Sequence, residues 1–108
     1  MTYATTIVAI ADPTRRAILE RIRAGEASVG EIAACLPVTR PAVSQHLRVL
    51  SDAGLLTVRQ AGTRRLYRLA PNGAADLRAW LDAMWADALS SFAAEARARA
   101  TSEKGTHK

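Results

Sequence analysis

Residues 39–68, TRPAVSQHLRVLSDAGLLTVRQAGTRRLYR, constrain the fold more than any other part of the chain. Thr39 can cap a helix and Pro41 fits the first turn of that helix, which Gly54 then ends. Two short apolar runs, 55–59 and 65–69, flank the glycine-containing segment QAGTR, and this pattern predicts a β-hairpin. The segment therefore predicts one helix followed at once by one hairpin.

The same segment holds the chain's excess positive charge. It contains one acid, Asp52, and six arginines: Arg40, Arg48, Arg59, Arg64, Arg65 and Arg68. Its net charge of +5 equals the formal net charge of the whole chain, so the other residues balance to zero. Charge confined to two adjacent elements indicates a docking surface for a polyanion, most commonly DNA.

Three shorter helices are predicted before this segment. Residues 3–10 carry apolar side chains at helical spacing, and Asp12 with Pro13 begins a second helix that ends at Gly25. The segment SVGE at 28–31 has the form of a capping box and begins a third helix, which Pro37 ends. Two helices joined by a tight turn and followed by a hairpin make a winged helix-turn-helix.

A long final helix is predicted from the break at residues 71–73 to about residue 100, because apolar residues recur along it at helical spacing. Residues 101–108 have no apolar anchor and are predicted to be disordered. We therefore expect a mainly α fold with one small β-hairpin: a winged helix-turn-helix DNA-binding and dimerisation domain over residues 1–100 and a tail over 101–108.

Composition excludes several classes of protein. No apolar run approaches the roughly 18 residues of a membrane span, and no secretory signal is recognised at the N-terminus. A single cysteine, Cys35, excludes an internal disulfide and fits a reducing cytoplasm. The chain shows no paired carboxylates on a pocket, no phosphate-binding glycine loop and no metal cluster, so we do not expect an enzyme or a cofactor.

The helix beginning near Arg40 offers side chains that suit the major groove of DNA. At about 100° per residue, Val43, Leu47 and Leu50 face the core, while Ser44, Gln45 and Arg48 face outward with Arg40 beside them. Ser44 and Gln45 are the preferred base readers, and Arg64 and Arg65 near the hairpin tip are expected to reach phosphate or the minor groove. The full predicted DNA-contacting set is Thr39, Arg40, Pro41, Ser44, Gln45, His46, Arg48, Arg59, Arg64 and Arg65.

Simpler interpretations of these residues stay open. The polar helix face can be merely solvated, and Arg59 and Arg68 can be ordinary outward-facing strand residues. Tyr67 and Leu69 alternate to the opposite face from Arg68, so both are expected in the core.

Residues 7–85 resemble the ArsR/SmtB family of bacterial transcriptional repressors. The resemblance is carried by ADPTRRAILERI, by SVGEIAACLPVTRPAVSQHLRVLSDAGLL and by the hairpin VRQAGTRRLYRLAP. The pattern S-x-H-L-x-x-L over 44–50, with the following AGLL, is specific in combination. The resemblance implies a winged-helix homodimer that binds an imperfect inverted repeat near its own promoter through a dimer interface built from the first and last helices.

The large apolar side chains of the final helix agree with a dimer, because a lone 108-residue chain would struggle to cover them. An internal core is the alternative, and it is favoured for Leu77 and Leu81. The predicted interface comprises Ile7, Ile10, Leu77, Trp80, Leu81, Met84, Trp85, Leu89 and Phe92.

The sequence departs from the family at the usual metal sites. A Cys-x-Cys pair is absent from the helix before the turn, which has only Cys35, and the last helix has Asp76, Asp82 and Asp87 but no histidine. We therefore expect solvated aspartates and no bound metal. His46 is interpreted as a packing or phosphate-contacting residue, and Cys35 is expected to be buried, with a redox role as the alternative.

The leading hypothesis is a cytoplasmic, homodimeric, autoregulating repressor that binds an inverted-repeat operator in double-stranded DNA without sensing metal, under a possible unknown effector. The alternatives are a winged-helix module that binds protein and a redox-responsive repressor that uses Cys35.

Overall fold

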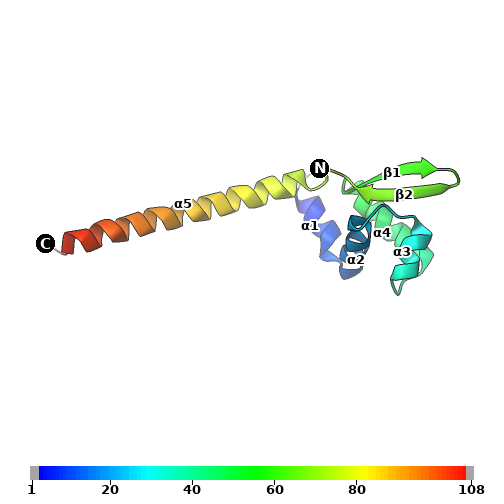
Figure 1. Ribbon diagram of the computed structural model, residues 1–108, viewed down its shortest axis with the longest axis horizontal. Helices are drawn as coiled ribbons and strands as arrows, with labels where there is room; N and C mark the ends of the chain where they lie inside the picture. Colours follow the sequence, from blue (N-terminus) through cyan, green and yellow to red (C-terminus); the bar gives the residue numbers. More distant parts are fainter. Residues whose placement is uncertain (1–2, 107–108) are drawn as a thin grey trace. The chain divides into compact units, whose positions relative to one another are not determined.

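The computed structural model describes residues 3–106, and the side chains of residues 3–101. Its elements, in order, are α1 (Tyr3–Ala11), α2 (Pro13–Arg23), α3 (Val29–Cys35), α4 (Arg40–Asp52), β1 (Leu56–Ala61), β2 (Arg64–Leu69) and α5 (Ala75–Thr106), as Figure 1 shows. The predicted mainly helical fold with one hairpin is confirmed, as is the helix-turn-helix formed by α3 and α4.

Three helices begin at the residues that the sequence pattern predicts. The Asp12 carboxylate accepts a hydrogen bond from the Arg15 N–H at 3.0 Å, and the Thr39 hydroxyl accepts from the Ala42 N–H at 3.3 Å. Ser28 and Glu31 form the complete capping box, each side chain accepting from the other residue's backbone N–H at 3.2 Å. These bonds satisfy N–H groups that have no partner inside the helix and so fix where each helix starts.

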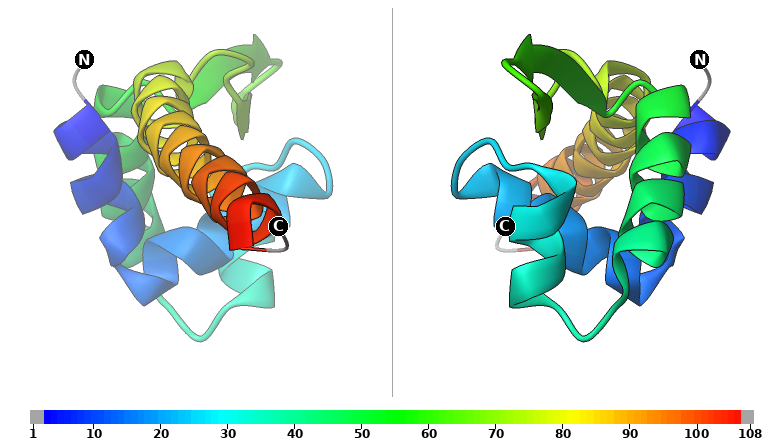
Figure 2. Two further views of the ribbon diagram at one scale, coloured as in Figure 1. Left: turned by 90° about the vertical axis from the view of Figure 1, so that its left-hand side faces the viewer. Right: turned by 90° about the vertical axis from the view of Figure 1, so that its right-hand side faces the viewer.

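The core lies where α2, α3 and α4 meet. Its largest fully buried side chains are Ile18, Ile32, Leu47, Leu50 and Val43, so one face of α4 is held firmly while the other is free to contact a partner. Helix α1 lies beside α4 in both views of Figure 2.

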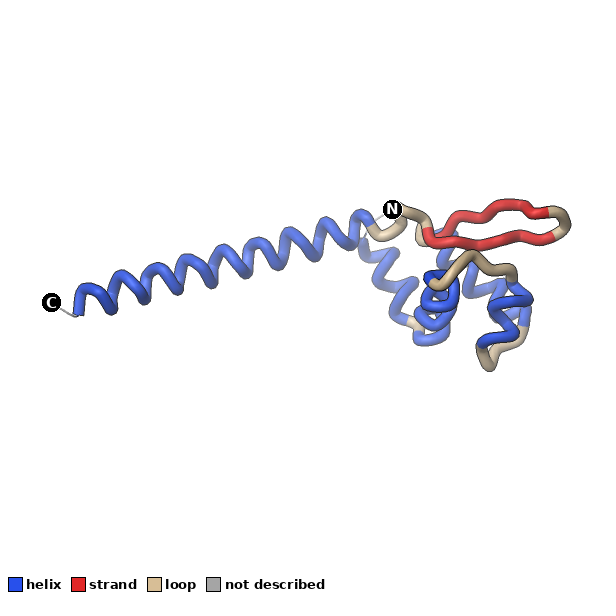
Figure 3. Tube along the Cα trace, viewed as in Figure 1, coloured by secondary structure: helices blue, strands red, loops and turns tan. Residues whose placement is uncertain are grey.

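The two strands form an antiparallel hairpin, here called the wing, which is drawn in red in Figure 3. Ala61 pairs with Arg64, so the connecting loop is only Gly62 and Thr63. Gly62 has a φ of +64°, as a type II′ turn requires at its first central position. The strands therefore extend closer to the tip than the sequence pattern predicts, and Arg64 belongs to β2 and not to the loop.

The base of the wing is anchored to the rest of the domain. Ala27 and Tyr67 exchange two backbone hydrogen bonds, of 3.0 and 2.8 Å, so the residue before the α3 cap adds a bridge to β2. Tyr67 packs against the core as expected. Leu69, however, is 39% exposed in the single chain, so the prediction that it is a core residue is wrong.

Residues up to Leu77 form one compact unit, and α5 from Arg78 onward forms a second. Helix α5 continues to Thr106, beyond the predicted end near residue 100. Positions 107 and 108 lie outside the described residues, and both the disorder of the tail and the domain boundary stay predictions. Among the described helices, none is long and apolar enough to cross a membrane.

Candidate nucleic-acid interface

The outer face of α4 presents the predicted base-reading side chains to solvent. Arg40, Ser44, Gln45 and Arg48 are all exposed, whereas Val43 and the other inward residues are buried. None of these four has a hydrogen bond or ion pair with another described residue. Their donors and acceptors are therefore available to a ligand, as direct reading of base edges requires.

The ends of this face are less uniform. Thr39 and Pro41 are exposed in the first turn, where the Thr39 hydroxyl already accepts the capping bond and can still donate its proton. His46 is half-buried and lies close enough to Asp12 to act on its carboxyl group. The pKa of Asp12 is lowered chiefly by its hydrogen bond from the Arg15 N–H, and the charges of Arg15 and His46 act in the same direction.

Two of the predicted wing contacts are already engaged by carboxylates. Arg59 donates through Nε to Glu26 at 2.9 Å and through its Nη2 to the same carboxylate. Arg64 donates through Nη2 to Glu31 and, at 3.3 Å, to the Ser28 hydroxyl. The structure thus pairs two arginines that the sequence suggested were free for DNA.

The other wing arginines have no carboxylate partner among the described residues. Arg65 is exposed without a hydrogen bond or ion pair, and Arg68 donates through Nε to the Thr57 hydroxyl at 3.1 Å. The charge that remains uncompensated therefore lies on Arg65 and Arg68 of the wing and on the two arginines of α4.

A groove of about 580 Å³ lies between the wing, the start of α3 and the start of α4. Arg40, Arg64 and Arg65 line it, together with one acid, Glu31. The Arg40 guanidinium packs over Gly30, where an added Cβ would lie 3.1 Å from Nη2. Three guanidinium groups around one groove make a surface that favours an anion.

Glu26 and Glu31 are the site residues that the sequence pattern does not reveal. The pKa of Glu26 is lowered chiefly by its hydrogen bond from Arg59, whereas that of Glu31 is lowered chiefly by hydrogen bonds from Ser28 and then by the charges of Arg64 and Arg21. The capping box identified Glu31 as a helix start, but no local signal linked it to a wing residue.

The predicted dimer interface has much exposed apolar surface in the single chain. On α5, Trp85, Leu89 and Phe92 are 61–69% exposed, and Trp80 and Met84 are 38% and 43% exposed. The remaining members are intermediate or, for Ile7 on α1, 39% exposed: Ile7, Ile10, Leu77 and Leu81.

Cys35 is exposed at the end of α3, so the prediction that it is buried is wrong. Val29, Ile32 and Leu36 turn toward the core, and at about 100° per residue Cys35 lies roughly a quarter-turn from the centre of that stripe. Within the described residues no group of three or more histidines, cysteines, aspartates or glutamates could hold a metal ion.

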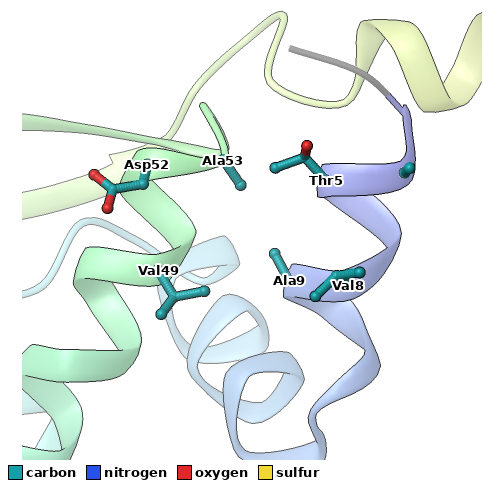
Figure 4. A pocket seen from close by; sticks show the side chains of 7 residues that line it. Thr5, Val8, Ala9, Val49, Asp52 and Ala53 are labelled. Atoms are coloured by element: carbon teal, nitrogen blue, oxygen red, sulfur yellow. The ribbon is translucent and has the colours of Figure 1, made fainter.

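A second concavity, of about 450 Å³, lies between α1 and α4 (Figure 4). Small and apolar side chains line most of it, including Val8, Ala9, Val49 and Ala53, while the Asp52 carboxylate at its edge points away from α1. It lies beside the end of α4 and not at the predicted base-reading residues.

Comparison with known proteins gives consistent matches. A family model described as a helix-turn-helix domain matches residues 10–59. The HTH-type transcriptional regulator Rv2034 of Mycobacterium tuberculosis is 58% identical over 85 residues, which cover 79% of this chain and 79% of that protein.

Solved structures agree with this match. The structure of an ArsR family transcriptional regulator, RHA00566, is 30% identical with a TM-score of 0.68, and the match covers 76% of this chain and 84% of that one. The homodimeric winged helix-turn-helix DNA-binding domain of Mb0332 from Mycobacterium bovis is 31% identical with a TM-score of 0.63, and the match covers 78% of each chain.

Proposed function

The chain belongs to the ArsR/SmtB family of DNA-binding transcriptional regulators, and we propose that it is an autoregulating repressor that binds an inverted-repeat operator as a homodimer without sensing metal. The observation that carries this proposal is the outer face of α4, whose polar side chains are exposed and have no partner within the described chain. Such a face beside an arginine-rich wing suits the major groove and the adjacent backbone of DNA.

The proposed DNA contacts fall into two kinds. Ser44 and Gln45 read base edges, supported by Arg40 and Arg48 on the same face. The remaining contacts are proposed to hold the backbone and set the register: Thr39, Pro41, His46, Arg59, Arg64 and Arg65.

A homodimer is supported by the exposed apolar side chains of α5 and by the homodimeric relative from Mycobacterium bovis. A symmetric dimer would present two copies of α4 about one DNA turn apart, roughly 34 Å, to an inverted repeat. Repression would follow from overlap of that operator with the polymerase site. Binding to chromosomal DNA would place the protein in the bacterial cytoplasm.

Fluorescence-anisotropy titration tests this proposal. Purified protein is titrated against the DNA upstream of its own gene and against a scrambled duplex, at two salt concentrations, with and without zinc. Tight, salt-sensitive binding that prefers the native sequence and ignores zinc is expected. No preference over scrambled DNA would contradict autoregulation, and salt-insensitive behaviour without DNA affinity would favour a protein-binding module.

The exposure of Cys35 favours a second candidate, a repressor that responds to oxidation. With one cysteine per chain, the only protein disulfide available is between two copies. Non-reducing electrophoresis after oxidant treatment would then show a covalent dimer that the Cys35→Ser variant lacks. Absence of that band would dispose of disulfide control.

A further inference from the structure

The Glu31 carboxylate occupies a position in the wing groove that resembles that of a bound anion. Its Oε1 accepts hydrogen bonds from Arg64 Nη2 and from the Ser28 N–H, the latter at 3.2 Å. Its Oε2 lies 4.0 Å from Arg21 Nη2. Glu31 is the only acid among the residues that line this groove, which also has Arg40 and Arg65.

The pair between Arg64 and Glu31 can be exchanged at low cost. The two side chains are 55% and 44% exposed, and ion pairs between exposed groups contribute only about 0–1 kcal/mol. A guanidinium group binds carboxylate and phosphate with the same planar fork of donors. Arg64 can therefore replace the Glu31 carboxylate with a backbone phosphate without loss of hydrogen bonds.

We propose that Glu31 is an internal competitor for DNA phosphate, which holds Arg64 in the free protein and thereby lowers the affinity for all DNA. This inference rests on the proposed DNA-binding function. Because binding to random DNA is electrostatic, one carboxylate that neutralises a wing arginine weakens it directly. Glu31 is thus an affinity-setting residue in addition to its place in the capping box.

The test is anisotropy titration of the Glu31→Gln protein against operator and scrambled DNA. Glutamine retains the side-chain oxygen that accepts the Ser28 N–H, so the start of α3 is preserved, which thermal denaturation checks. Glu20→Gln is the matched control, because it makes the same change in net charge on α2, where Glu20 pairs with Arg23. Glu31→Gln is expected to tighten binding by up to about fivefold beyond the control.

A double-variant cycle assigns the gain to Arg64. In an Arg64→Ala background, Glu31→Gln is expected to have no more effect than Glu20→Gln. Equal effects of Glu31→Gln and Glu20→Gln on the protein with Arg64 would overturn the proposal, and so would weaker binding by a stable Glu31→Gln protein, since Glu31 would then position the wing for DNA.

A comparison that leaves Glu31 intact keeps the inference testable if Glu31→Gln does not fold. Arg64→Ala is expected to weaken binding less than Arg65→Ala, because Arg64 must first leave a carboxylate and Arg65 has none. A larger loss for Arg64→Ala would contradict the competition. Wild-type protein that binds no DNA would remove the proposed function itself, whereas wild-type binding without these differences would remove only the role of Glu31.

Discussion

The turn that follows the wing leaves no room for a side chain at Gly73. A Cβ there would lie 2.7 Å from the Gly54 carbonyl oxygen, 2.9 Å from Leu55 Cα and 3.2 Å from the Ala70 carbonyl oxygen. All three neighbours are backbone atoms, and Leu55 and Ala70 are joined by a 2.9 Å hydrogen bond. Gly73→Ala must therefore shift the junction between α4 and the wing.

Overpacking of this kind typically costs about 1–3 kcal/mol, and the smaller conformational entropy of the unfolded alanine chain returns about 0.4–1 kcal/mol. We expect Gly73→Ala to lose about 1–2 kcal/mol of stability and several degrees of melting temperature. Thermal and urea denaturation measure both, at one protein concentration for all variants because association shifts the midpoint.

Gly30→Ala is the matched control. An added Cβ at Gly30 meets Arg40 Nη2 at 3.1 Å, which is the far end of a flexible side chain that can move away. Alanine also favours the helical backbone of α3 by up to about 1 kcal/mol. Its stability should be unchanged or higher, so a Gly73→Ala protein as stable as Gly30→Ala would refute the argument from backbone contact.

Three further outcomes follow from the site. Gln45→Ala should cost roughly 1–3 kcal/mol on the operator and little on random DNA in paired titrations, and an equal loss on both would exclude base reading. Arg65→Ala should weaken binding similarly on all sequences and flatten the plot of log affinity against log salt by about one unit, whereas an unchanged slope would exclude a phosphate contact. Because the pKa values of Glu26 and Glu31 are lowered from 4.5, the stability that they contribute is present above that pH and lost as the pH falls through the lowered folded values. Melting temperatures measured through this range should therefore fall less steeply for a Glu26→Gln, Glu31→Gln protein, and identical curves would contradict the linkage.

The helix starts could be predicted from the sequence because each depends on a bond between near neighbours. Asp12, Ser28 and Thr39 each accept from an N–H three residues ahead, so the whole device is contained in a few letters. The inward face of α4 could be predicted for the same reason, since helical periodicity alone places Leu47 and Leu50 together.

The state of the wing arginines could not be predicted in this way. Each of the two ion pairs joins residues 33 positions apart, Arg59 to Glu26 and Arg64 to Glu31. A charge count over residues 39–68 sees only Asp52 and so overstates the free positive charge. The fold delivers the missing acids through the bridge of Ala27 to the wing, a contact without any local sequence signal.

The role of Glu31 and the proposed dimer together make a prediction that neither makes alone. A symmetric dimer carries the Arg64–Glu31 pair twice, so a gain of up to about fivefold per subunit becomes up to about 25-fold on a full operator. On a duplex with a single half-site, where only one subunit reaches the groove, the gain should stay near the single value. Titration of wild-type and Glu31→Gln protein against both duplexes measures the two ratios. Equal gains on full and half-sites would mean that only one wing per complex exchanges its carboxylate for phosphate, which a symmetric dimer on an inverted repeat does not allow.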